Sequence, residues 1–208
     1  HFLNAGAGYG GSCFPKDVRA LVQTAEKAGV DPVILKSVEH RNELQKRVLF
    51  QRVSDYFSSD LSDKTIAVWG LSFKPNTNDM RDAPSRVLLE ALWNANAKVR
   101  AYDPKAMEEC RAIYGDRPDM TYCASEYQAT EGADALVVVT EWPVFRAANL
   151  ARLRRNLKSR VIFDGRNIFD APAMKEHGLT YVCIGRSMIR KAPAKVIPLK
   201  RKRKMAAA

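Results

Sequence analysis

The chain has 208 residues, of which 46% are hydrophobic, and a formal net charge of +11. This length and composition suffice to bury an ordinary core and exclude a disordered polymer. Nine basic side chains and no acidic ones fall in residues 186–208, which leaves about +2 for residues 1–185. The charge therefore argues against nucleic-acid binding by the body of the protein and confines any polyanion binding to a basic tail.

No apolar stretch approaches the ~20 residues that a membrane helix requires, so we expect no membrane span. The cysteines show no Cys-x-x-Cys spacing and follow no signal peptide; they are Cys13, Cys110, Cys123 and Cys183. We therefore expect free thiols in a reducing cytoplasm and no disulfide framework, and we assign no metal site. Because the chain begins at His1, directly at a motif, we expect that a further segment precedes it.

Residues 8–17 place a cysteine between a glycine-rich loop and a helix whose first turn contains Pro15. Cys13 then lies at a helix N-terminus, where the macrodipole and Lys16 favour a nucleophilic thiolate. Asp17, four residues later, is expected to project into the same pocket and orient water. The alternative is a buried structural thiol. The surrounding glycines favour the nucleophile, because they clear an approach for a ligand that a core cysteine does not need.

Apolar residues at spacings of three and four predict helices across residues 15–57. Gly29 ends the first helix, and Asp31 and Pro32 open the second as its N-cap and first-turn residue. The second helix, of roughly 25 residues and ~38 Å, has more apolar surface than one flank of a small domain needs. It is long enough to bridge two domains or to pair with a symmetry mate, and an ordinary amphipathic core helix is the third possibility.

Residues 60–64 mark a boundary, after which apolar strands alternate with helices. We expect strands at 65–70, 99–102, 120–123, 135–139, 160–163 and 180–183. We expect helices at 84–96, 127–131 and 150–157. This alternation predicts a doubly wound α/β fold with a parallel sheet covered on both faces. The expected units are a helical segment over 1–60, an α/β domain over 61–185 and a disordered tail over 186–208.

Ligands of such sheets bind outside the carboxyl ends of the strands, near the switch in strand order. Three loops are expected there, at residues 70–74, 140–142 and 164–167. Lys74 and Arg166 can pair with phosphates, although each cation taken singly is also what an ordinary surface loop carries.

The first of these loops is not a dinucleotide fingerprint. Gly70 stands alone, and a long segment separates it from the next helix. Phe73 can pack on a sugar or a base. We therefore expect this domain to bind a nucleotide, but not in the manner of NAD.

Several short motifs follow one another along residues 1–185. They are GGSCFPKD at 10–17, FK at 73–74, Arg81, TEW at 140–142 and FDGRN at 163–167. In this order and spacing the chain resembles the UDP-glucose/GDP-mannose dehydrogenase family. The resemblance implies a Rossmann-like UDP-binding domain preceded by a helical segment whose long helix forms a homodimer. It favours UDP-glucose over GDP-mannose or UDP-N-acetylmannosamine as the substrate.

The resemblance implies a four-electron oxidation of UDP-glucose to UDP-glucuronate by two NAD molecules. Cys13 would attack the intermediate aldehyde, loss of hydride from the thiohemiacetal would give a thioester, and water positioned by Asp17 would hydrolyse it. Lys16 and Arg81 would reach toward NAD. Substrate-binding roles are implied for Phe2, Asn4, Gly6, Tyr9, Gly10, Phe73, Lys74 and Arg166.

The family's NAD fingerprint and two of its catalytic residues come from before the cysteine motif. We therefore expect that this chain alone neither binds NAD well nor turns over. Two alternatives stay open: a non-catalytic UDP-sugar-binding or assembly module, and a dehydrogenase of another nucleotide sugar such as GDP-mannose. A weaker alternative is polyanion binding through the tail.

Overall fold

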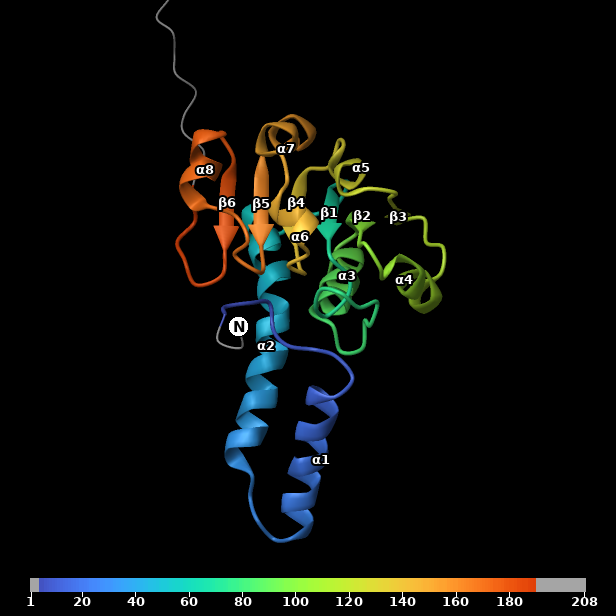
Figure 1. Ribbon diagram of the computed structural model, residues 1–208, viewed down its shortest axis with the longest axis vertical. Helices are drawn as coiled ribbons and strands as arrows, with labels where there is room; N and C mark the ends of the chain where they lie inside the picture. Colours follow the sequence, from blue (N-terminus) through green and yellow to red (C-terminus); the bar gives the residue numbers. More distant parts are fainter. Residues whose placement is uncertain (1–3, 190–208) are drawn as a thin grey trace, which may run out of the picture.

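The computed structural model describes residues 4–189, so Phe2 and most of the basic tail lie outside the described residues. Six parallel strands form a sheet in the order β3-β2-β1-β4-β5-β6 (Figure 1). The strands are β1 (Thr65–Trp69), β2 (Lys98–Tyr102), β3 (Met120–Tyr122), β4 (Ala135–Val138), β5 (Val161–Asp164) and β6 (Thr180–Cys183). This is the doubly wound order of Rossmann-like sheets, and it confirms the expected fold class.

Successive residues of each strand face opposite sides of the sheet, which gives the domain two cores. Ile66 and Val68 of β1 belong to one hydrophobic cluster, and Ala67 and Trp69 belong to the other. The first cluster includes side chains of α3 (Pro84–Asn94) and α4 (Met107–Tyr114). The second includes side chains of α5 (Glu126–Thr130), α6 (Pro143–Arg146), α7 (Leu150–Asn156) and α8 (Ala171–Glu176).

Two helices, α1 (Phe14–Lys27) and α2 (Val33–Tyr56), form a hairpin that extends beyond the carboxyl ends of the strands (Figure 1). The helix expected at roughly 25 residues has 24. Its second half packs into the first core through Leu49 and Val53, whereas its first half lies against α1. One helix therefore joins the hairpin to the sheet. Within residues 4–189, no helix has the length and apolar character needed to cross a bilayer.

The expected N-cap of the second helix is wrong. The helix begins at Val33, Pro32 holds the cap position, and no side chain caps it. The carboxylate of Asp31 instead accepts a hydrogen bond from Lys36 Nζ at 3.0 Å. Because this ammonium group offers a charged donor, the side chain of Asp31 is taken by an ion pair across the turn.

Three short helices, α4, α6 and α8, were not expected from the sequence. They contain 8, 4 and 6 residues, and each buries few side chains, among them Cys110, Phe145 and Met174. A periodicity of 3.6 residues cannot be recognised over one or two turns. These helices therefore depend on the sheet on which they pack.

At Gly70, β1 leaves the sheet next to the loop that follows β4. The residue has φ +91°, and a β-carbon there would lie 2.4 Å from Cβ of Thr140. No side chain fits at this contact, so the two loops at the switch in strand order touch through backbone and Thr140.

We expect Gly70→Ala to lower the free energy of unfolding by at least about 2 kcal/mol, because it adds an overpacked atom to a strained backbone conformation. Urea denaturation followed by circular dichroism measures the change. Gly132→Ala is the control, since Gly132 has φ +71° but no atom near its β-carbon position. Equal losses in the two variants would show that the contact with Thr140 contributes nothing.

Candidate functional site

Residues 4–12 form a loop beneath the carboxyl ends of the strands, and α2 holds this loop from one side (Figure 1). The amide of Asn42 accepts a hydrogen bond from the backbone N–H of Tyr9 at 2.8 Å and donates one to its carbonyl at 3.1 Å. Gln45 Nε2 donates to the carbonyl of Gly6 at 2.7 Å. Two side chains of one helix therefore fix the path of the loop.

On its other side the loop packs against the segment between β1 and α3. A β-carbon on Gly10 would lie 2.4 Å from the carbonyl oxygen of Asp82. A β-carbon on Gly11, which has φ +96°, would lie 2.7 Å from the ring of Phe73. The N–H of Gly11 donates to the carbonyl of Arg81 at 2.7 Å. The sequence predicted that the glycines clear an approach for a ligand. At Gly10 and Gly11 a neighbouring part of the chain occupies that space instead.

Cys13 is exposed and occupies the N-cap position of α1, with Pro15 in the first turn. Its sulfur lies 3.6 Å from Ser12 Oγ. Asp17 is the largest cause of the raised pKa of Lys16, and Cys13 adds a smaller electrostatic contribution. Asp79 acts in the same way on the pKa of Arg81, again with a smaller contribution from Cys13. The structure therefore brings two cations near the thiol.

Asp17 does not share an enclosed pocket with Cys13. Its carboxylate pairs with Lys16 Nζ at 2.9 Å, and the two side chains are 63% and 72% exposed. At the first turn of a helix that extends into solvent, the nearest cation takes this carboxylate. The spacing of four residues correctly predicted that Cys13 and Asp17 lie at the same end of the helix. It did not show that Asp17 is open to solvent.

Arg166 joins the three loops at the strand ends. Its Nε donates to the carbonyl of Val139 at 2.7 Å, and its Nη2 donates to the carbonyl of Phe73 at 3.2 Å. Glu141 Oε2 lies 3.1 Å from Nε as an ion pair. Burial lowers the pKa of Arg166, and the nearby carboxylates of Glu141 and Asp164 oppose that shift. A β-carbon on Gly6 would lie 3.1 Å from Nη1, so the glycine loop reaches this guanidinium.

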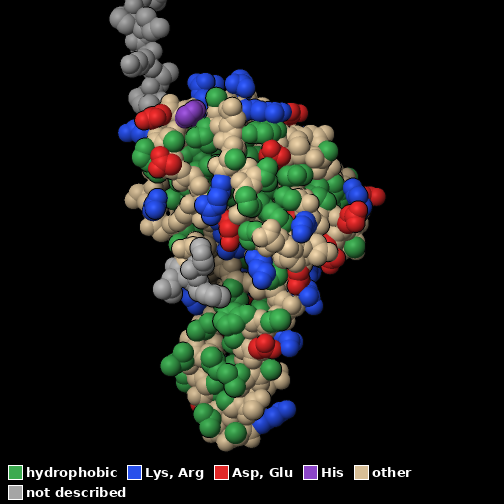
Figure 2. All heavy atoms as spheres, viewed as in Figure 1, with side chains coloured by type: hydrophobic (Ala, Val, Ile, Leu, Met, Phe, Trp, Pro, Cys, Tyr) green, Lys and Arg blue, Asp and Glu red, His purple; other side chains and the backbone are tan. Residues whose placement is uncertain are grey.

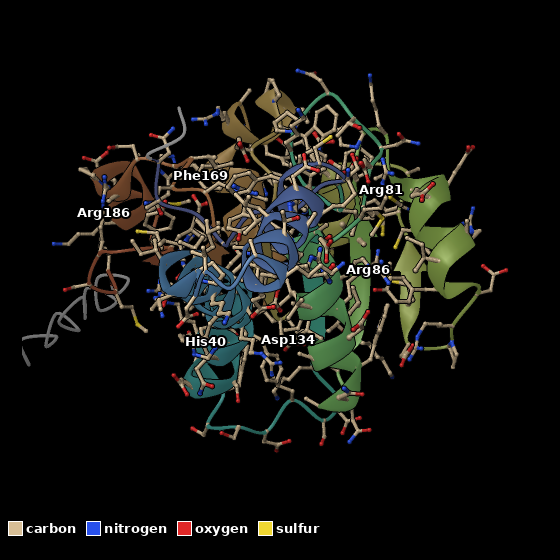
Figure 3. The ribbon with its side chains drawn as sticks, turned by 90° about the horizontal axis from the view of Figure 1, so that it is seen from below. His40, Arg81, Arg86, Asp134, Phe169 and Arg186 are labelled. Carbon is tan, nitrogen blue, oxygen red and sulfur yellow. The ribbon has the colours of Figure 1, made fainter. Side chains whose placement is uncertain are left out.

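The remaining residues predicted to bind substrate or cofactor have other surroundings. Lys74 is exposed, with its ammonium group 5.2 Å from the centre of the Phe73 ring. The hydroxyl of Tyr9 donates to Glu39, and burial, followed by this hydrogen bond, raises the pKa of Tyr9. Asn4 is exposed at the start of the described chain. Seen from below, Arg81 lies on the side of the molecule that α3 and α4 occupy (Figure 3).

Sequence reasoning assigned no role to several residues that build the site. Asp103 and Asp164 are buried carboxylates at the ends of β2 and β5. Asp164 accepts hydrogen bonds from the N–H groups of Arg166 and Ile168 and from the hydroxyl of Tyr181. Their position after a buried strand was visible in the sequence. Their partners were not visible, because some of the donors lie far away in the sequence: Tyr181 for Asp164, and Leu71 and Trp142 for Asp103.

Comparison with known proteins fits this geometry. Residues 67–171 match the UDP binding domain of the UDP-glucose/GDP-mannose dehydrogenase family, and residues 1–44 match its central domain. The chain belongs to this family. The first match covers most of the α/β sheet, and the second covers the glycine loop, α1 and part of α2.

Individual members of the family resemble the chain over most of its length. A UDP-glucose 6-dehydrogenase of Pseudomonas aeruginosa is 48% identical over 89% of this chain and 42% of its own length. The chain thus spans about two fifths of such relatives.

Solved structures of family members match as well. A UDP-glucose dehydrogenase from Pyrobaculum islandicum has a TM-score of 0.72 at 33% identity, over 81% of this chain and 37% of its own. A UDP-D-ManNAc dehydrogenase from Pyrococcus horikoshii has a TM-score of 0.69 at 30% identity, over 87% of this chain and 40% of its own.

We expect Gly10→Ala to displace the loop and change the rate at which Cys13 reacts with a thiol reagent by at least about threefold, because the new methyl group collides with backbone. Reaction of the native chain with a chromogenic disulfide measures this rate, since the other three cysteines are buried.

Gly29→Ala is the matched control for this change. It strains the turn between α1 and α2, where the β-carbon position has no neighbour. It should leave the reaction rate unchanged, because the turn lies a full helix away from Cys13. Equal rates for all three proteins would contradict the close packing at Gly10.

Proposed function

We propose that this chain supplies the nucleotide-sugar site and the nucleophile of an enzyme that oxidises UDP-glucose to UDP-glucuronate. The observation that carries the proposal is the contact between the loop preceding Cys13 and the loops bearing Phe73 and Arg166. An exposed thiol thereby stands beside the strand ends at which α/β sheets bind nucleotides. Membership of the family and the match of residues 67–171 to its UDP binding domain support it.

In this proposal the cations at the strand ends hold the diphosphate. Lys74 reaches it as an exposed point charge, while Arg166 presents the N–H groups that Val139 and Phe73 leave free. Phe73 packs on the UDP portion. The glycine loop holds uridine and sugar through Asn4, Gly6, Tyr9 and Gly10, with Phe2 outside the described residues.

The proposed chemistry oxidises C6 of the sugar twice. The alcohol loses a hydride and a proton to give an aldehyde, and the thiolate of Cys13 adds to the aldehyde carbon to form a thiohemiacetal. Loss of a second hydride leaves a thioester on Cys13. Water then adds to the thioester carbonyl, the carboxylate forms and the thiol is released. Asp17, once freed from Lys16, is the carboxylate proposed to position that water.

NAD, two molecules for each sugar, would supply the hydride acceptor for both oxidations, but the α/β domain described here does not fit NAD in the Rossmann manner. The segment after β1 lacks the glycine fingerprint, and the acid at the end of β2, Asp103, is buried and fully engaged by internal donors. Lys16 and Arg81 are exposed cations near Cys13, which suits contact with a cofactor held by another part of the protein.

A second candidate is the same site acting on another nucleotide sugar. The similarity to a UDP-D-ManNAc dehydrogenase favours it. Comparing turnover of UDP-glucose, UDP-N-acetylmannosamine and GDP-mannose separates these possibilities. Binding of UDP without turnover of any sugar would instead favour a non-catalytic module.

We further propose residues 1–60 and 61–185 as the functional units, with residues 186–208 as a tail that lies mostly outside the described residues. The cysteines of the chain are all free, which suits a reducing cytoplasm.

Turnover is tested with the chain extended to the full length of its relatives, the remainder being taken from the Pseudomonas aeruginosa protein. We expect Cys13→Ser to lower UDP-glucuronate formation from UDP-glucose on the order of 10³-fold or more, because the nucleophile that forms the thioester is lost. Cys110→Ala is the control: burial raises the pKa of that thiol to about 11, so its loss should leave the rate unchanged. Undiminished turnover in Cys13→Ser would remove the nucleophile from the proposal.

We also propose that the hairpin forms a homodimer. Hydrophobic side chains gather on the lobe made by α1 and α2 (Figure 2). Ile34 is 79% exposed, and other exposed apolar residues of the lobe are Phe14, Leu21, Val30, Val33, Val38 and Leu44. A patch of this kind marks an interaction surface.

We expect the chain to sediment as a dimer and Ile34→Glu to sediment as a monomer, because a charge cannot be buried unpaired in an apolar interface. Val144→Glu, which changes an exposed apolar residue of α6, should remain dimeric. A native chain that stays monomeric at high micromolar concentration would contradict the proposed interface.

A further inference from the structure

Asp103 follows β2 directly and is 1% exposed. In dinucleotide-binding sheets the acid at this place reads the ribose of the ligand. Here the carboxylate is turned inward and accepts hydrogen bonds from six donors. They are the N–H groups of Leu71 and Ser72, the hydroxyl of Ser72, the indole of Trp142 and the N–H groups of Lys105 and Ala106.

These donors come from the loops that follow three different strands. Oδ2 accepts from Leu71 at 2.7 Å in the loop after β1 and from Trp142 Nε1 at 3.0 Å in the loop after β4. Oδ1 accepts from Lys105 and Ala106, both at 2.8 Å, in the loop after β2. Because all the partners donate, only an acceptor-only group such as a carboxylate satisfies them together.

The loops tied by Asp103 are the loops that hold Arg166. Phe73 and Val139 supply the carbonyls that accept from its guanidinium, and Glu141, next to Trp142, supplies the ion pair. The one hydrogen of the Ser72 hydroxyl is shared between Asp103 Oδ2 at 3.2 Å and the carbonyl of Lys74 at 2.9 Å. Asp103 thus touches the neighbours of both proposed phosphate-binding cations and neither cation itself.

We propose that Asp103 is a positioning residue for the nucleotide site, acting through the loops after β1 and β4 to hold Arg166 and Lys74 in binding geometry. The inference rests on the proposed function, because it takes UDP as the ligand of these cations. It gives a role to an acid whose counterpart in dinucleotide sites faces the ligand. Asp103 acts on the site indirectly, because its own lone pairs accept hydrogen bonds from donors of the protein.

The test is titration calorimetry of UDP into the 208-residue chain. Asp103→Asn replaces one acceptor oxygen by an amide that faces N–H donors, so we expect it to weaken UDP binding about 30-fold. Asp134→Asn is the matched control, because Asp134 is also a shielded carboxylate that accepts a backbone N–H, that of Thr65, at the opposite end of β1. It should lower stability while leaving UDP affinity within about twofold of the native chain.

A double variant separates a positioning role of Asp103 from a merely structural one. Because Arg166 is one of the two cations that Asp103 is proposed to hold, the variant that combines Asp103→Asn with Arg166→Lys should lose less UDP affinity than the product of the two single losses. Independent, multiplying effects would overturn the inference, as would native UDP affinity in a folded Asp103→Asn chain.

A further variant covers the case in which Asp103→Asn does not fold. Trp142→Phe removes only one of the six donors, so we expect it to fold and to weaken UDP binding about fivefold. Unchanged affinity in Trp142→Phe would overturn the inference on its own. A native chain that binds no UDP would overturn the proposed function first, which distinguishes the two failures.

Discussion

The close backbone approach at Gly10 and Gly11 is the constraint on which the arrangement of the site depends. Two segments about seventy residues apart in sequence come so near that a β-carbon on Gly10 would lie 2.4 Å from the carbonyl of Asp82. The opposite edge of the loop is held by the amide of Asn42 on α2. Cys13 is therefore placed relative to the strand ends by backbone packing, and its own contact with Ser12 adds little to this placement.

At the strand ends, two acidic side chains are buried and a basic side chain is exposed. The carboxylates of Asp103 and Asp164 are buried and accept N–H and O–H donors, so their negative charge is offset within the protein. Lys74 remains exposed. Arg166 is partly buried, and it is held by backbone carbonyls and by Glu141. The buried acids therefore lie deeper than the exposed ammonium group of Lys74.

Helix α2 carries out two structural tasks because its surface changes along its length. Leu49 and Val53 near its end are buried in the sheet's core, whereas Ile34 near its start is exposed on the hairpin. Lys46, between these regions, is itself buried and pairs with Glu43 at 2.9 Å. Midway along its length the helix contacts the glycine loop through Asn42 and Gln45, so the same helix holds the hairpin, the loop and the sheet together.

The sequence by itself determined the strands, most of the helices, the helix start beside Cys13 and the loops that carry Lys74 and Arg166, because these depend on local periodicity and on glycine and proline chemistry. It did not predict helices as short as α6, whose four residues cannot show a period. Only the tertiary structure decided three carboxylate contacts. Asp17 pairs with Lys16, Asp31 pairs with Lys36 instead of capping α2, and Asp103 accepts hydrogen bonds from inside the protein. Each of these outcomes depends on which donor lies closest to the carboxylate, and the packing of the chain sets the position of that donor.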